Sequence, residues 1–460
     1  MHRPRSFRTI PVLVTVLALS AGACGDLVVP DFNNPSIEDL TANASPTTIR
    51  QASQGMLIGA RSYMSAQNGY VSLLGILGRE SYNFDPADTR FITEMLVGPL
   101  DRGSPAFGAN LFTLRYRNLR LGNAILAALG PVAGLTAAQK EAVRGFVKTI
   151  QAHDLLMVIN TRDDYGAPID VDISPTGPPA AIATRADAFA RVVLLLNDAD
   201  THLAAGGAAF PFSLGPGFAG FDTPSTLRLV NRALKGRVDV YMGNFATALV
   251  SLGASFLSTT ASLDLGAFHS FSSAPGDAEN LLYDPTGRAI LAHPSIMADA
   301  QLQAGGARDA RVGRKVVVLP APRTVQGVTT DVMFSIFNSP AAPVPLIRNE
   351  ELILLRAEAN IGLNTVGSLA LAQADINVVR ARSGNLAAVG TFATQTAALN
   401  ELLYNKRYSL LFEGGHRWID LRRYGRLPTL PLAVPSHSRP SRFPFPEAKC
   451  LPRSPSPPGC

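Results

Sequence analysis

Apolar residues recur along much of this chain at steps of three and four, the spacing that gathers them on one face of an α-helix. The clearest example follows Thr136, which with Gln139 has the sequence pattern of a capping box at a helix N-terminus. An apolar stripe then runs from Val143 to Ile150. The pattern predicts a long helix that ends near Thr161. Similar stripes predict helices within residues 45–65, 110–129 and 185–204.

Two later segments have the pattern of paired helices. Residues 225–257 predict two helices joined at Gly243 and Phe245, and residues 354–385 repeat the plan, with Gly362 as the predicted end of the first helix. A glycine at the turn and an aromatic residue between the helices resemble a tetratricopeptide repeat. Because no strict period is present, we predict a mainly α fold, an irregular right-handed helical bundle with tetratricopeptide-like helix pairs and long loops.

The helical pattern is interrupted in residues 258–345, which are rich in Gly, Ser and Pro and contain short β-like runs at 315–322 and 331–338. We expect long loops here and a small hairpin packed on the helices. The predicted organisation is a signal peptide at 1–23, an N-terminal helical region at 24–257, and a C-terminal region at 258–460 with a loop-rich insert and closing helices.

The N-terminus predicts export and lipidation. A basic start is followed by an apolar run from Ile10 to Leu19 and then by small residues, which is typical of a secretory signal. Ala21, Gly22, Ala23 and Cys24 resemble a bacterial lipobox, in which the cysteine becomes the lipidated first residue of the mature protein. Several acyl chains at Cys24 would hold the protein on a membrane without a spanning helix. No later segment has 18 uninterrupted apolar residues.

Composition narrows the possible functions further. The formal charge is +6, from 41 Lys and Arg against 35 Asp and Glu, but three of the arginines lie in the first ten residues and no basic run follows, so we predict no nucleic-acid partner. No nucleophile elbow, zinc-protease motif, phosphate-binding loop or Cys/His metal spacing is present, so we predict a protein that is not an enzyme and has no cofactor. Cys450 and Cys460 are close in a Pro-rich tail, and a disulfide between them is left open.

The closing part of the chain contains two further motifs, RYSLLFEGGHRWIDLRR (407–423) and FPFPEA (443–448). Apart from one extra glycine at Gly414-Gly415, the first resembles a characteristic helix of the SusD/RagB family of nutrient-binding outer-membrane lipoproteins, and the second resembles the motif that follows that helix. The lipoprotein leader and residues 135–172 and 345–385 are also similar. The resemblance implies a SusD-like helical fold and a lipid-anchored, surface-exposed position in the cell outer membrane. It also implies delivery of a ligand to a TonB-dependent, SusC-like transporter.

The charged segment at 407–427 invites comparison with an active site, but its spacing favours a structural role. On one continuous helix, Glu413 would reach Arg417 at i,i+4, and Asp420 lies three residues from Arg417 and from Arg423. Cationic neighbours keep such acids ionised, and arginine cannot serve as a base. The residues assigned to this structural motif are Glu413, His416, Arg417, Trp418, Asp420, Arg422 and Arg423.

Candidate ligand contacts are aromatic residues in loops, because sugar rings stack on aromatic faces while polar side chains bind their hydroxyls. The candidates are Tyr82, Asn83, Phe84, Arg90, Phe218, Phe221, Phe268 and Tyr283. Since these loops are rich in Phe and the chain has one Trp, a peptide ligand stays as open as an oligosaccharide. Two rival functions remain: a helical envelope scaffold without a small ligand, and an envelope hydrolase. Asp163 and Asp164 are adjacent carboxylates that could imitate a glycosidase pair, but the TRDDYG sequence around them predicts a turn.

Overall fold

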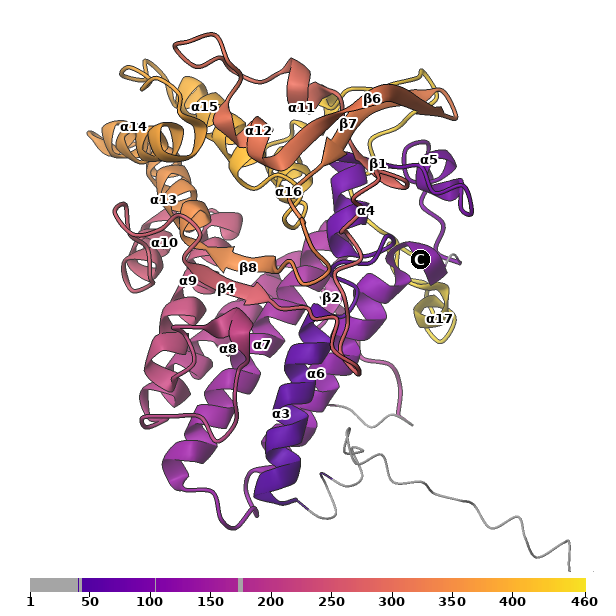
Figure 1. Cartoon of the computed structure of the whole chain (residues 1–460). Helices are drawn as coiled ribbons and strands as arrows, with labels where there is room; N and C mark the ends of the chain where they lie inside the picture. The colour runs from indigo at the N-terminus through magenta and orange to yellow at the C-terminus, as the bar shows by residue number, and fades with distance from the viewer. Residues whose placement is uncertain (1–39, 41–43, 104, 173–176) are drawn as a thin grey trace, which may run out of the picture.

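The computed structural model describes residue 40 and residues 44–103, 105–172 and 177–460, and Figure 1 shows their arrangement. The predicted signal peptide and Cys24 lie outside these residues. The fold is mainly α, as predicted. Its long helices are α3 (Pro46–Arg61), α6 (Asn110–Ala128), α7 (Ala137–Arg162), α8 (Arg185–Ala204), α9 (Pro224–Met242), α10 (Phe245–Gly253), α13 (Asn349–Leu363), α14 (Ser368–Val379) and α15 (Gln395–Ser409).

Most of the N-terminal helices run side by side. Helices α3 and α6 pack on α7, which packs on α8, and α8 packs on α9, so that each helix covers the apolar stripe of its neighbour (Figure 1). The capping box that begins α7 is present, because the Thr136 side chain accepts from the Gln139 backbone N–H and the Gln139 side chain accepts from that of Thr136. The predicted start and type of this helix are therefore confirmed.

The two predicted helix pairs are α9–α10 and α13–α14, and they stack because α10 packs on α13. Gly243 ends α9 in the left-handed conformation, with φ of 78°. The prediction that Gly362 ends α13 is wrong, because the helix continues to Leu363 and Asn364 adopts the left-handed conformation. Gly362 instead makes room for the ring of Phe245, since a Cβ on Gly362 would lie 2.2 Å from a ring carbon.

Strands from distant parts of the chain form a small sheet above the helices. Its order is β1 (Ser81–Asn83), β5 (Ile290–Ala292), β7 (Val328–Phe334) and β6 (Val316–Val325), with antiparallel neighbours. Strands β6 and β7 are the predicted hairpin, which turns at Gln326 and Gly327, both with positive φ. A separate antiparallel ribbon pairs β4 (Gly266–His269) with β8 (Val344–Arg348), and β2 (Ala167–Pro168) pairs with β3 (Ile182–Ala183).

Short elements connect these layers and close the chain. They are α4 (Tyr70–Leu77), α5 (Arg90–Thr93), η1 (Pro105–Ala109), η2 (Asp163–Tyr165), η3 (Pro216–Phe218), α11 (Ser295–Ala298), α12 (Ala310–Lys315), η4 (Arg380–Gly384), α16 (His416–Arg423), η5 (Leu427–Thr429) and α17 (Glu447–Cys450). At the end of the described chain, a disulfide joins Cys450 to Cys460, so the bond left open by the sequence is present.

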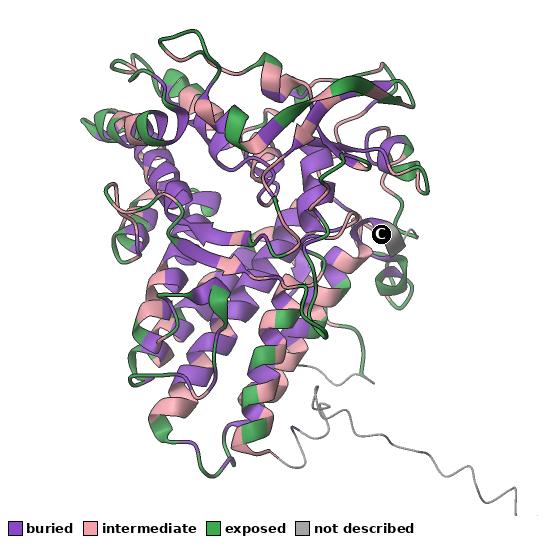
Figure 2. Cartoon of the chain, in the orientation of Figure 1, coloured by how far each residue is buried: buried purple, intermediate pink, exposed green. Residues whose placement is uncertain are grey.

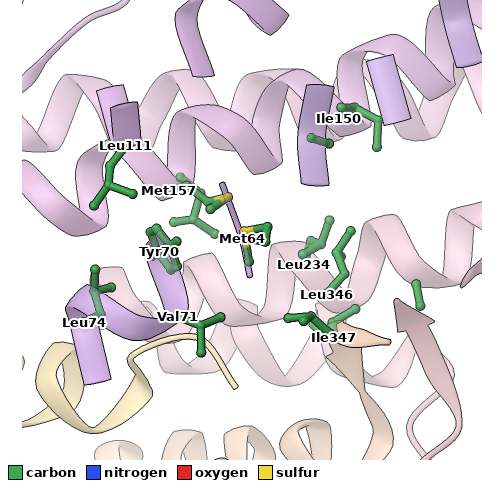
Figure 3. Close-up of a cluster of buried hydrophobic side chains, with 14 of the residues drawn as sticks. Met64, Tyr70, Val71, Leu74, Leu111, Ile150, Met157, Leu234, Leu346 and Ile347 are labelled. Atoms are coloured by element: carbon green, nitrogen blue, oxygen red, sulfur yellow. The ribbon is translucent and has the colours of Figure 1, made fainter. Parts of the chain in front are cut away.

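A continuous apolar core unites the layers. Purple buried segments run through the helices and the ribbon in Figure 2. Figure 3 shows part of this core, in which Tyr70 from α4 lies near Met157 from α7, and Leu234 from α9 lies near Leu346 from β8. A second, smaller apolar cluster lies between α13, α14 and α15. Because the main cluster draws on both sides of residue 257, the boundary between 24–257 and 258–460 stays a prediction.

Candidate functional site

The charged closing segment is not one helix. Helix α15 ends at Ser409, and α16 begins at His416 after a turn in which Phe412 and Gly415 have positive φ. Gly415 is required there on two counts, since its φ is 73° and a Cβ would lie 2.3 Å from Leu74. The predicted i,i+4 contact between Glu413 and Arg417 is therefore wrong, because the turn moves Glu413 off the helix.

Glu413 binds cations from other elements instead. Its carboxylate accepts from Arg348 Nε at 2.9 Å and from Lys315 Nζ at 2.9 Å. Arg348 also forms an ion pair with Glu350. Burial raises the pKa of Glu350, but Arg348 and Lys315 lower it more strongly, to about 2. These four side chains, the Glu413 network, thus form a balanced set of two cations and two ionised carboxylates.

A second buried set of ion pairs, the Lys406 network, joins α13, α15 and α16. Lys406 Nζ lies 2.7 Å from carboxylate oxygens of both Glu358 and Asp420. Arg423 completes the set, at 2.8 Å from Glu358 and 3.0 Å from Asp420, and the Tyr424 hydroxyl donates to Glu358 at 2.8 Å. Burial lowers the pKa of Lys406, but the two carboxylates raise it by more than burial lowers it, so the ammonium stays charged. The i,i+3 pair of Asp420 and Arg423 matches the sequence pattern.

The remaining motif residues bind backbone carbonyls of distant segments. Trp418 is fully buried and donates from Nε1 to the Pro440 carbonyl at 2.9 Å, while Arg422 donates to the Asn160 carbonyl at 2.7 Å. Arg417 donates to the Arg79 carbonyl at 3.2 Å and does not pair with Asp420. Burial lowers the pKa of His416, which keeps its imidazole neutral at pH 7. The closing segment therefore connects three parts of the fold that are far apart in sequence, through the carbonyls of Arg79, Asn160 and Pro440.

A better candidate for binding is a cavity of about 430 Å³ beside helix α3, here called the α3 pocket. Its walls come from five segments that are far apart in sequence: one face of α3, the loop at 213–218, both ends of the 268–277 stretch, and single residues of α7 and β8. Both aromatic and polar side chains line it. They include Gln54, Ile58, Arg61, Leu214, Phe218, Phe268, His269 and Asp277.

Two of the predicted ligand contacts, Phe218 and Phe268, line the α3 pocket; Phe268 is half-buried, whereas Phe218 is only 4% exposed and also belongs to the apolar core. Four others are core residues: Tyr82, Asn83, Phe84 and Phe221 are each at most 3% exposed. The prediction that these four offer a surface to a ligand is therefore corrected. Arg90 is exposed and paired with Asp88, and Tyr283 is half-buried, but neither lines the pocket.

Pairing with β5 and the residue before it explains three of the four buried candidates, Tyr82, Asn83 and Phe84. Tyr82 pairs with Leu291 in the sheet, and its ring lies 5.9 Å from that of Phe84 and 4.9 Å from that of His293. Phe221 packs 4.8 Å from the ring of Phe256. A loop-like local sequence cannot reveal that a strand more than 200 residues away covers it.

Charged residues at the α3 pocket escaped the sequence analysis. Arg61 of α3 forms an ion pair with Asp277, 216 positions later, and donates to the Ser270 carbonyl. Its guanidinium also lies 5.7 Å from the centroid of the Phe271 ring. These contacts fasten the 270–277 loop to α3 beside the pocket. Their separation in sequence leaves no local signal that could have revealed them.

A neutral histidine adds hydrogen-bonding capacity to the same wall. His269 is buried, and burial, with Arg115 and Arg61, lowers its pKa to about 3. Its Nε2 has no hydrogen-bond partner among the residues described here. A neutral imidazole can donate from one nitrogen and accept at the other, so it suits hydroxyl or amide groups. The α3 pocket thus combines two aromatic rings, a neutral imidazole and an ion pair.

In the described part of the chain, no group of three or more His, Cys, Asp or Glu side chains is placed to hold a metal ion. Over the same residues, every helix is too short or too polar to cross a membrane.

Comparison with known proteins identifies the architecture. The model of the SusD family matches residues 335–443. A SusD superfamily protein from Bacteroides vulgatus has 16% sequence identity and a TM-score of 0.66, with 89% of this chain and 97% of that chain covered. A SusD-like carbohydrate-binding protein from Bacteroides fragilis has 15% identity and a TM-score of 0.64, with 82% and 86% covered.

A laminarin-binding SusD-like protein has 17% identity and a TM-score of 0.60, with 90% of this chain and 99% of that chain covered. No curated protein sequence matches this chain. The family model matches the segment that holds the whole Lys406 network and three of the four side chains of the Glu413 network, with Lys315 outside it. The solved structures share the fold over more than four-fifths of the chain. Residues 335–443 are thus similar to the SusD family, and the chain shares the fold of the SusD-like solved structures.

Proposed function

We propose that this protein is a surface lipoprotein of the SusD type that binds oligosaccharides or other oligomeric nutrients in the α3 pocket. The observation that carries the proposal is the pocket itself, whose lining includes the half-buried Phe268, the buried Phe218 and the buried His269, whose Nε2 has no hydrogen-bond partner in the described part of the chain. Aromatic faces and a few well-placed polar groups are what a sugar ring needs for binding. The SusD-like neighbours described as carbohydrate-binding and laminarin-binding support this ligand class.

The proposed role includes an anchor and a partner. Lipidation at Cys24 would hold the protein at the outer membrane, and a TonB-dependent, SusC-like receptor would take the ligand onward. Both follow from the resemblance to the family. Loss of labelling with radioactive palmitate in Cys24→Ser would support the anchor. Recovery of a large TonB-dependent barrel with the chain purified in mild detergent would support the partner.

Binding can be tested with the full chain in detergent and a panel of neutral glucans and short peptides, measured by isothermal titration calorimetry. Each stacking contact contributes about 0.5–1.5 kcal/mol, so Phe218→Ala with Phe268→Ala should weaken binding by roughly 5- to 150-fold. Tyr283→Ala is the matched control, since Tyr283 is a half-buried aromatic residue outside the pocket.

Three results would point elsewhere. Silence across the whole panel would favour a scaffold that has no small ligand. Turnover of a panel member would indicate a hydrolase. A larger loss of binding in Tyr283→Ala than in the double variant would move the binding face to the loops near Arg90 and Tyr283, which stay candidates outside the α3 pocket.

A further inference from the structure

We propose a second binding site, for the carboxylate groups of an acidic oligosaccharide, in a groove of about 550 Å³ at the junction of β8 and α13. The groove is called here the arginine groove. It lies between the loop at 262–264, the end of α12, the start of α13 and the turn η4. It shares no lining residue with the α3 pocket, so the proposal does not rest on the function proposed above.

The inner wall of the arginine groove is the Glu413 network and is electrically balanced. Arg348 and Lys315 supply two positive charges, and Glu350 and Glu413 supply two negative charges. The cations lower the pKa of both carboxyl groups, against the effect of burial, so both acids stay ionised at neutral pH. This wall therefore has no unpaired charge to offer a ligand, but it gives the groove a rigid polar base.

The outer wall carries two further arginines, Arg314 and Arg382, and both are exposed. Arg314 Nη2 donates to the Ser383 carbonyl at 2.7 Å and to its hydroxyl at 3.1 Å. Arg382 Nη1 donates to the Thr259 carbonyl at 2.6 Å, and its Nη2 to the Ala261 carbonyl at 2.8 Å. Each guanidinium is thus anchored on neutral oxygens, which do not compensate its positive charge.

Neither outer arginine has a carboxylate partner within the described ranges, since every ion pair of the groove involves other cations. The groove contains one more acid, Asp264, whose side chain is 86% exposed and lies 3.6 Å from Arg348. Four cations therefore face three carboxylates, and the positive excess lies on the outer wall. A guanidinium has five N–H donors, so Arg314 and Arg382 retain donors for an anion after their backbone contacts.

The chemistry of the lining selects the ligand class. Arginine binds carboxylates through two parallel hydrogen bonds, which gives both affinity and orientation. Apart from Leu263 and Ile336 the lining is polar, and it includes the hydroxyl-bearing residues Ser262 and Ser383 but no aromatic ring. Such a surface suits a ligand rich in hydroxyls and carboxylates more than a peptide with apolar side chains. The volume lies within the range of small-ligand sites, about 300–1,000 Å³.

The test uses the full chain in detergent and a trimer of galacturonic acid, with a galactose trimer as the neutral control. Calorimetry should detect the acidic trimer and not the neutral one, and the affinity should fall as salt rises from 50 to 500 mM. Loss of two charge-assisted contacts in Arg314→Gln with Arg382→Gln should weaken binding by about tenfold or more. Arg117→Gln, an exposed arginine on α6, is the matched control and should bind as the native chain does.

A conservative variant separates binding from folding. Arg314→Lys with Arg382→Lys keeps both charges and should retain salt-dependent binding, although it loses the paired geometry of the guanidinium. Unchanged affinity in the double glutamine variant would overturn the proposal, as would equal binding of the neutral trimer. Binding of glutamate-rich peptides without binding of the uronate would overturn the sugar-acid assignment. Phe218→Ala should leave uronate binding intact, so the failure of either site can be recognised separately.

Discussion

Lys406 provides the sharpest test of how the closing segment holds the fold. Its ammonium lies 2.7 Å from both Glu358 and Asp420, and its side chain is 2% exposed. Lys406→Met keeps much of the side-chain volume but removes the charge. The buried set then changes from two cations and two carboxylates to Arg423 alone facing both acids. Because one negative charge is left uncompensated, we expect the free energy of unfolding to fall by about 3–5 kcal/mol.

The assay is equilibrium unfolding in urea, followed by far-ultraviolet circular dichroism and by the fluorescence of Trp418. Since Trp418 is the only tryptophan and lies on α16 beside the Lys406 network, coincidence of the two signals tests for a single transition. Lys449→Met is the matched control, because Lys449 is exposed and should change stability by less than about 0.5 kcal/mol.

The pH dependence gives the prediction a second, independent outcome. Lys406 and Arg423 lower the pKa of Glu358 against the effect of burial, so this carboxyl stabilises the native protein above pH 4.5, its ordinary pKa. Without Lys406, protonation of one acid relieves the uncompensated charge. The stability gap between native and Lys406→Met should therefore be widest near pH 8 and narrow toward pH 4. A loss under about 1 kcal/mol, or a gap that ignores pH, would refute the reasoning.

Three further predictions test other parts of the fold. Burial raises the pKa of Glu80 to about 7, although Arg417 opposes the shift. The free energy of unfolding should therefore fall as the pH rises from 4.5 to 7. In thermal unfolding, Glu80→Gln should stabilise the chain by roughly 2–3 kcal/mol at pH 8 and hardly at pH 4.5. Gly362→Ala should destabilise by about 1 kcal/mol, because the clash with Phe245 exceeds the gain in helix propensity, and should become stabilising in a Phe245→Ala background in urea titrations. Cys450→Ser opens a link between residues ten positions apart and should cost about 2–3 kcal/mol in urea titrations relative to the oxidised chain, with no difference once a reductant is present.

Local sequence patterns were sufficient to predict the helices, but not which distant residues pack against them. The Thr136 capping box and the apolar stripe after it are contained within one helix, so the sequence predicted α7 correctly. The hairpin at 316–334 was also predictable, because its two strands are adjacent in sequence. Gly362 was misassigned because the ring it accommodates belongs to Phe245, more than 100 residues earlier.

The candidate site was predictable only in part, for the same physical reason. Phe218 and Phe268 were found because an aromatic residue in a segment of loop-like composition is a local signal, although Phe268 lies in strand β4. Arg61 and Asp277 were missed because neither is unusual in its own segment, and they meet only when the 270–277 loop folds back on α3. Tyr82 was placed wrongly because a buried strand and an aromatic loop look alike without the strand that covers it.

Both candidate sites border the β4–β8 ribbon, so the buried ion pairs that hold this ribbon also affect the positions of residues in the two sites. Gly266 pairs with Arg348 at the end of the ribbon near the arginine groove, and Phe268 pairs with Pro345 toward the α3 pocket. Because Arg348 is fixed by the Glu413 network, the register of the ribbon, and with it the position of Phe268, depends on buried charges outside the pocket. A change at Glu413 should therefore impair both stability and ligand affinity, whereas a change at Phe268 should impair affinity at the α3 pocket with a much smaller effect on stability.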